Sequence, residues 1–120
     1  MFVERSDMKF KDFHDGTTRV QLGKLPGIMG CTMTFKKGAF TVPHAHDDHL
    51  QFIYFLKGKF EITCGSEKRI CLPGDCMYAD YNELHGSFAL EDDSMLLDVH
   101  TPMRSDIDKD FDYTLAEKEK

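Results

Sequence analysis

Three histidines and one glutamine are the residues of this chain most suited to chemistry. His44 and His46 are separated by a single residue, Gln51 follows soon after, and His85 lies far downstream. Imidazole nitrogen and amide oxygen are both ligands for divalent transition metals. Residues i and i+2 of an extended strand point to the same side, so His44 and His46 can converge on one ion. We therefore predict a half-open metal site, completed by Gln51 and His85 and able to accept a substrate.

Glycines at regular positions frame these four residues. Gly38 precedes the first pair of histidines, Gly58 follows Gln51, and Gly74 with Asp75 precedes the last histidine. A histidine pair alone can arise by chance among six histidines, but these further spacings have no reason to agree by chance. The whole arrangement favours a metal site over a coincidence of composition.

The spacings resemble the two motifs of the cupin superfamily. Its first motif reads G(X)5HXH(X)3–4E(X)6G, and its second combines Gly-Asp with a later proline and histidine. The chain departs from these motifs in having Gln51 at the usual glutamate and Asp80 where proline is usual. The resemblance implies a small double-stranded β-helix, or jelly-roll barrel, with the metal inside one end and a metal-binding core over about residues 28–104.

Short β-type runs separated by turn formers supply the elements that position these residues. Many short strands at regular spacing indicate a sandwich or barrel, and Gly58 between two runs predicts a hairpin turn. We expect an all-β, single-domain fold over residues 1–120, with a short helix around Asp108–Glu119. The expected strands are Thr18–Leu22, Ile28–Phe35, Gln51–Leu56, Lys59–Cys64, Lys68–Leu72, Cys76–Ala79, Ser87–Leu90 and Met95–His100.

Charge and hydropathy narrow the range of partners. The formal charge is −6 and the pI about 5.4, which argues against nucleic acid or an anionic membrane as a partner. The first ten residues carry too many charges for a signal peptide. The apolar run 52–56 is far shorter than the ~20 residues that a membrane helix needs. We expect a cytoplasmic protein.

The strand Gln51–Leu56 predicts self-association. Phe52 and Tyr54 alternate with Ile53 and Phe55, so both faces of the strand are apolar. A strand with one face in solvent would carry polar residues on that face. Burial of the second face against another subunit explains the pattern, and we expect a homodimer.

The segment after His85 narrows the family further. Its pattern LEDD…LLDV, continued by a proline and Arg104, resembles the KdgF-type cupins of pectin and alginate breakdown. The resemblance extends from about Thr18 to Phe111. That family also uses three histidines and a glutamine, so Gln51 agrees with it. Asp98 and Arg104 match the family's acid/base aspartate and substrate-binding arginine, whereas His100 stands where the family commonly has phenylalanine.

The resemblance implies the conversion of 4,5-unsaturated monouronates into linear keto sugars. The residue types suit this task, because neutral ligands leave the charge of the ion uncompensated and favour an anionic substrate. Arg104 can bind a carboxylate through two donors, and Asp98 can move a proton. The expected cofactor is one divalent transition metal ion, with Ni, Mn, Fe, Co and Zn equally suited to these ligands. The expected partner is a small anionic sugar.

Several alternatives stay open from the residues alone. Asp98 is equally suited to a structural salt bridge with Arg104. His49 is read as an exposed loop residue in preference to a further ligand, and Tyr54, Phe60 and Phe88 are expected in the core.

Two other functions fit the same ligand set. One is a metal-dependent cupin dioxygenase, and the other is a sugar-binding cupin without turnover. The sequence leaves open which metal binds and whether the substrate comes from pectin or alginate.

Overall fold

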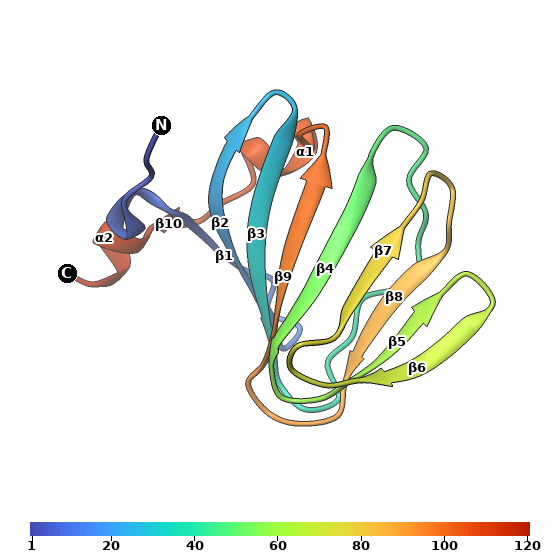
Figure 1. Ribbon diagram of the computed structural model, residues 1–120. Coiled ribbons are helices and arrows are strands. Elements are labelled where there is room, and N and C mark those ends of the chain that lie inside the picture. The colour runs from blue at the N-terminus through green and yellow to red at the C-terminus, as the bar shows by residue number, and fades with distance from the viewer.

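Two antiparallel β-sheets face each other in the computed structural model, which describes residues 1–120 (Figure 1). The strands are β1 (Lys9–Asp12), β2 (Thr17–Leu25), β3 (Ile28–Phe35), β4 (Leu50–Lys57), β5 (Phe60–Cys64), β6 (Glu67–Cys71), β7 (Cys76–Ala79), β8 (His85–Ala89), β9 (Ser94–Thr101) and β10 (Tyr113–Thr114). The larger sheet has the order β10-β1-β2-β3-β9-β4-β7, and the smaller has the order β6-β5-β8. This two-sheet arrangement confirms the expected all-β jelly roll.

Burial alternates along the central strands and defines their inward faces. In β9, Ser94, Leu96, Asp98 and His100 are buried, while the residues between them are only partly buried. In β4 the buried positions are Gln51, Ile53 and Phe55. This period of two is what a strand requires when one face packs against a core.

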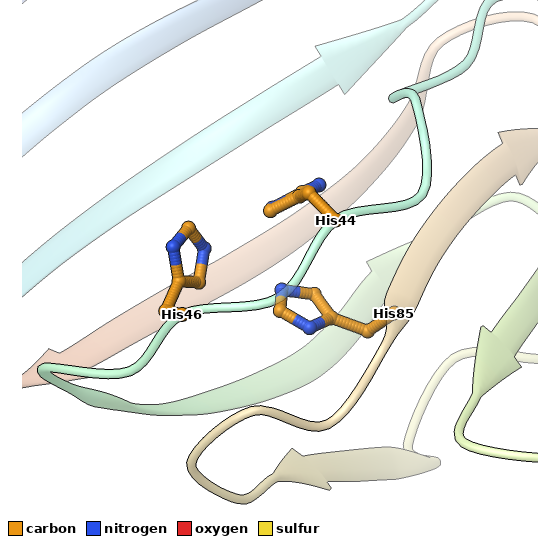
Figure 2. Close-up of side chains that lie close together, drawn as sticks. All are labelled: His44, His46 and His85. Atoms are coloured by element: carbon orange, nitrogen blue, oxygen red, sulfur yellow. The ribbon is translucent and has the colours of Figure 1, made fainter.

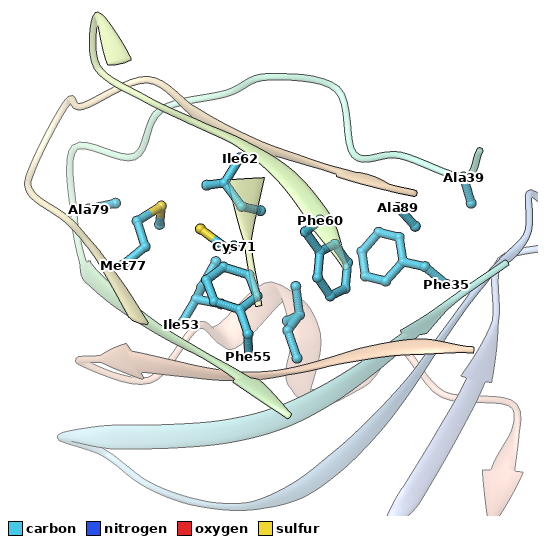
Figure 3. Close-up of a cluster of buried hydrophobic side chains, with 11 residues drawn as sticks. Phe35, Ala39, Ile53, Phe55, Phe60, Ile62, Cys71, Met77, Ala79 and Ala89 are labelled. Atoms are coloured by element: carbon cyan, nitrogen blue, oxygen red, sulfur yellow. The ribbon is translucent and has the colours of Figure 1, made fainter. Parts of the chain in front are cut away.

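The space between the sheets is apolar at one end and polar at the other. The apolar end is filled by a cluster of eleven buried residues (Figure 3): Phe35, Ala39, Ile53, Phe55, Phe60, Ile62, Cys71, Met77, Ala79, Ala89 and Leu96. At the polar end, Gln51 pairs in register with His100, and Ile53 pairs with Asp98. The inward faces of β4 and β9 therefore contribute apolar side chains to the core at one end of the barrel and polar side chains at the other end.

The eight strands expected from sequence are all present, with bounds that differ by a few residues. The structure adds β1 and β10, which pair with each other along one edge of the larger sheet. These two strands were missed because β1 buries a single residue, Phe10, and β10 buries none. Too few apolar residues alternate in them to give a recognisable pattern.

The turn at Gly58 differs from the expected hairpin. Gly58 has a positive φ of 80°, as expected for glycine in a turn. However, β4 pairs with β7 and β9 in the larger sheet, whereas β5 pairs with β6 and β8 in the smaller. The chain therefore crosses from one sheet to the other at Gly58, and the hairpin prediction is wrong.

The C-terminal region contains a short helix, as expected, but not over the whole of Asp108–Glu119. This region comprises α1 (Ser105–Asp108), then β10, then α2 (Leu115–Lys118). Near the N-terminus the chain forms the 3-10 helix η1 (Arg5–Asp7). Thr114 and Glu117 form a reciprocal capping box that starts α2. No helix of the structure has the length and apolar character needed to span a membrane.

Three aromatic residues were expected in the core, and one of them lies there. Phe60 is fully buried, whereas Tyr54 is 38% exposed and Phe88 is 40% exposed. Tyr54 points away from the core because it has the opposite parity to Ile53 and Phe55 in β4. Phe88 packs against Phe40, with ring centroids 6.3 Å apart, on the outside of the smaller sheet. The core prediction is therefore wrong for Tyr54 and Phe88.

Candidate functional site

The three histidines of the sequence motifs come together at the polar end of the barrel (Figure 2). His44 and His85 exchange two backbone hydrogen bonds of 2.9 Å each, which fixes the loop before β4 against the start of β8. The loop is held again where the amide of Asn82 donates to the carbonyl of His46, at 2.6 Å. His44 and His46 lie in this extended loop and not in a regular strand, so the sequence argument from strand periodicity was wrong in that detail.

These histidines can hold a metal ion. One ring nitrogen of each of His44, His46 and His85 lies within 4.8 Å of the others. His85 is buried, and the other two are half-buried, so the group is enclosed by protein on one side and accessible on the other. Such a half-open arrangement is typical of metal sites that leave a position for a substrate.

Backbone carbonyls fix the orientation of two of the rings. Nδ1 of His44 lies 2.7 Å from the carbonyl oxygen of Val42, and Nδ1 of His85 lies 2.9 Å from that of Glu83. A carbonyl oxygen can only accept, so each Nδ1 carries the proton and donates it. In the neutral rings Nε2 then bears a lone pair, which is the tautomer that binds metal ions in proteins.

Gln51 connects this histidine group to Asp98. Its Nε2 donates to Oδ1 of Asp98 at 2.5 Å, and its Oε1 lies 3.0 Å from Nε2 of His85. When His85 is neutral, its Nε2 and the Oε1 of Gln51 both carry lone pairs. Two acceptors at this distance repel each other unless a cation or a proton lies between them. The pairing of Gln51 with His85 therefore fits a bound cation with Gln51 as a fourth ligand.

Burial favours the neutral form of His46 and His85. It lowers the pKa of His46 from 6.5 to about 4, with the nearby His49 as the next cause. Burial also lowers the pKa of His85, although the hydrogen bond to the Glu83 carbonyl opposes the shift. Nε2 of His46 is buried and has no hydrogen-bond partner in the protein. Neutral rings with free lone pairs are the form required of a metal ligand.

A cavity of about 450 Å³ opens next to the histidines. Its walls combine an apolar floor from the core with the polar residues of the site. The lining residues are Met33, Phe35, Thr41, Val42, His44, Gln51, Ile53, His85, Ser87, Leu96, Asp98 and Arg104. Five of the six residues singled out from sequence therefore line one cavity, and the sixth, His46, lies beside it.

Asp98 is a buried carboxyl group in this cavity. Burial raises its pKa from 3.8 to about 6, and the hydrogen bond from Gln51 and the charge of Arg104 oppose the rise. A carboxyl group with a pKa in this range can take up and release a proton near neutral pH. Asp98 therefore has the properties of an acid/base group.

Arg104 does not pair with Asp98. Its Nη2 lies 2.6 Å from Oδ2 of Asp106, and its Nε donates to Oδ1 of the same carboxylate at 3.2 Å. The alternative in which Asp98 and Arg104 form a structural salt bridge is thus wrong. Arg104 is free of Asp98 and lines the same cavity.

Two further histidines lie behind the site. His49 is 5% exposed and His100 is 1% exposed, so the expectation of an exposed His49 is wrong. The ring of His49 packs on that of His46, with centroids 4.0 Å apart, and lies 5.2 Å from the ring of His100. Nε2 of His100 is 3.9 Å from Oδ2 of Asp98.

The alternation of inward and outward positions along the chain predicts part of the placement of His49 and His100. His49 precedes Gln51 by two residues, and His100 follows Asp98 by two, so each shares the inward face of a predicted site residue. The ring of His49, in a loop, packs against the ring of His100 in β9. No feature of the sequence predicts this contact. His100 supports Asp98 from behind and is not part of the cavity wall.

The sequence and the fold of this chain are similar to those of known proteins. A family model described as a cupin domain matches residues 31–100. The pectin degradation protein KdgF of Dickeya dadantii is 38% identical over 97 residues, which cover 81% of this chain and 88% of that protein.

Solved structures show the same relationship. A structure of KdgF from a Halomonas species superimposes with a TM-score of 0.84 at 34% identity, covering 89% of this chain and 99% of that one. An RmlC-like cupin from Shewanella frigidimarina gives a TM-score of 0.82 at 26% identity, covering 88% and 94% of the two chains. The chain belongs to the cupin superfamily and, within it, to the KdgF family.

Proposed function

We propose that this protein opens the ring of a 4,5-unsaturated monouronate and yields the linear keto sugar, with one divalent transition metal ion as cofactor. The observation that carries the proposal is the contact of Gln51 with both His85 and Asp98, which links the candidate metal ligands to an acid/base group in one cavity. The similarity to a protein described as acting in pectin degradation supports a sugar-derived substrate.

His44, His46, Gln51 and His85 would hold the metal ion. His44 and His85 each carry the proton on Nδ1, which leaves Nε2 available to a metal ion. Oε1 of Gln51 lies next to Nε2 of His85, so both lone pairs can face one cation. When bound, the ion supplies Lewis-acid polarisation of a substrate oxygen.

Asp98 moves the proton in the proposed reaction. Its carboxylate accepts the proton of the anomeric hydroxyl while the bond between the anomeric carbon and the ring oxygen breaks, leaving an aldehyde and an enolate whose negative charge lies on the C5 oxygen. The same proton is then delivered to C4 of the enolate, and the C5 oxygen becomes a ketone. The reaction is an isomerisation, so no oxidant or second substrate is required. A pKa of about 6 suits Asp98 to both steps.

Arg104 binds the substrate carboxylate. It is the one arginine or lysine among the residues that line the cavity, and a guanidinium group matches a planar carboxylate with two parallel donors. Binding at Arg104 holds the C4–C5 end of the sugar and keeps the anomeric end free to approach Asp98.

The test follows the substrate directly. Protein loaded with metal is mixed with an unsaturated monouronate, and loss of the ultraviolet band of the conjugated alkene is recorded, with the ketone product identified by NMR. We expect one metal ion per chain, turnover in the loaded protein, no turnover after chelation, and recovery when metal is restored. A fully loaded protein that leaves the uronate unchanged contradicts the proposal, and oxygen uptake by that protein would favour the dioxygenase alternative.

A further inference from the structure

Arg104 is held by an acidic neighbour two residues along the chain. Nε of Arg104 donates to Oδ1 of Asp106 at 3.2 Å, and Nη2 lies 2.6 Å from Oδ2. The two contacts run side by side from one guanidinium to one carboxylate. The side chain of Arg104 is 22% exposed, whereas that of Asp106 is 65% exposed. The pair therefore reaches from the cavity wall to the protein surface.

A guanidinium group has two edges that each present two parallel N–H donors. One edge consists of Nε and Nη2, and the other consists of Nη1 and Nη2. Asp106 takes up the first edge of Arg104. The second edge remains for a planar oxyanion, and it matches the two oxygens of one carboxylate.

The short helix α1 fixes Asp106 in place. Ile107 is 5% exposed and packs with Met29 and Cys31, two fully buried residues of β3. The amide of Ile107 donates to the carbonyl of Arg104 at 3.2 Å. On the same helix Asp108 forms an ion pair with Lys24 of β2. Asp106 thus sits on a turn that is anchored to the larger sheet by the packing of Ile107, and the pair of Asp108 with Lys24 makes no contact with Arg104.

We propose that Asp106 is a positioning residue, which orients Arg104 so that its Nη1–Nη2 edge receives one carboxylate group of the ligand. This inference deepens the proposed function and rests on it for the identity of the substrate. It assigns to Asp106 a part in the selectivity of the site for a carboxylate over a neutral sugar.

A different role for the same contact is a latch, in which Asp106 competes with the ligand for Arg104. The free second edge argues against a latch, because a ligand can bind Arg104 without displacing Asp106. The two roles predict opposite effects on ligand affinity when Asp106 is removed.

The experiment compares Asp106→Ala with Asp108→Ala. Both variants remove an acidic residue of α1 and break one ion pair, but only Asp106 contacts Arg104. We expect Asp106→Ala to raise KM for the unsaturated uronate by about threefold to tenfold with little change in kcat, as for loss of uniform binding. Asp108→Ala should leave KM unchanged, and Asp106→Glu should recover part of the affinity.

A binding measurement separates this inference from the proposed reaction. Galacturonate, a saturated uronate, and its neutral methyl ester are titrated into each metal-loaded protein, and the ratio of their affinities is recorded. The ratio should fall in Asp106→Ala and stay constant in Asp108→Ala, even if the wild-type protein turns over no unsaturated uronate. Unchanged KM and unchanged ratio in Asp106→Ala overturn the inference, and tighter binding in that variant overturns it in favour of a latch.

Discussion

Asp98 differs from the other acidic residues of this protein in having each carboxylate oxygen next to a different buried side chain. Oδ1 accepts from Gln51 at 2.5 Å, and Oδ2 lies 3.9 Å from Nε2 of His100. Burial favours the neutral acid, while Gln51 favours the carboxylate, and the result is a raised pKa of about 6. Such a balance of opposing causes is expected for a group that changes its protonation state during a reaction.

Replacing the carboxyl group of Asp98 tests its role as proton carrier. Asp98→Asn keeps the shape and can still accept from Gln51, but it cannot take up the proton. We expect turnover of unsaturated uronate to fall by about 10²–10⁴-fold, with metal content unchanged by elemental analysis. The exposed loop residue Asp47 provides a control, because Asp47→Asn makes the same chemical change outside the cavity. Wild-type turnover in Asp98→Asn would refute the mechanism.

The buried histidines predict how the stability of the metal-free protein depends on pH. Burial lowers the pKa of His46 to about 4 and that of His100 to about 3. Between these values and the ordinary histidine value of 6.5, the unfolded chain binds more protons than the folded chain, so stability falls as the pH falls. Asp98 acts in the opposite direction, because its pKa is raised, and it offsets only part of this loss.

We therefore expect the melting temperature of the metal-free protein to decrease between pH 6.5 and pH 4. The measurement is thermal unfolding over this range after chelation and dialysis. His100→Phe removes the histidine with the larger shift, and Phe is the residue that the family commonly carries at this position. Its melting temperature should depend less steeply on pH than that of the wild type. Equal slopes for the two proteins would contradict the assignment to His100.

Among the connections between strands, the turn at Gly58 is the most constrained. It passes the chain from β4 to β5, and so from one sheet to the other, with φ at 80°. A Cβ at this position would lie 2.2 Å from Oγ of Ser94 and 2.7 Å from its Cα. Both the backbone conformation and the approach of β9 require glycine.

Gly58→Ala should destabilise the protein through two separate effects. The left-handed backbone costs about 1–2 kcal/mol for alanine, and overpacking against Ser94 adds about 1–3 kcal/mol. Gly38→Ala provides the control, because Gly38 has φ at 86° but no atom within 4 Å of the added Cβ. Denaturant unfolding should show the smaller loss for Gly38→Ala. Equal losses in the two variants would mean that the contact with Ser94 relaxes without cost.

The outer face of the larger sheet carries apolar residues that the isolated chain leaves in solvent. Tyr54 is 38% exposed, Leu56 is 41% exposed, and Tyr78 on the neighbouring β7 is 70% exposed. A row of such residues on a sheet is a common mark of an interface. The homodimer was expected because both faces of the strand Gln51–Leu56 are apolar in the sequence. Self-association through this face stays a prediction.

A direct mass measurement tests the homodimer. We expect light scattering after size exclusion at micromolar concentration to give twice the chain mass of 13.8 kDa. Tyr54→Lys and Tyr78→Lys place charges on the outer face and should shift the mass toward a single chain. A wild-type mass near that of one chain would contradict the prediction.

The sequence by itself determined the class of fold and eight of the strands, and it predicted the residues of the candidate site. Inward and outward positions follow from a period of two. The spacing of His44, His46, Gln51 and His85 identifies the metal motif even though His44 and His46 lie in a loop and not in a strand. Asp98 and His100 share one face of their strand by the same parity, and both lie on the buried face of β9. These features depend on local order along the chain, which a sequence records.

Only the tertiary structure decided which residues meet across the barrel. The turn at Gly58 joins two sheets and not two paired strands, because pairing partners are chosen by packing of the whole sandwich. His49 is buried because its loop folds over His100, and Arg104 pairs with Asp106 because α1 is anchored on β3 by Ile107. Contacts between segments distant in the chain depend on how the sheets close around the core, and no local pattern encodes that closure.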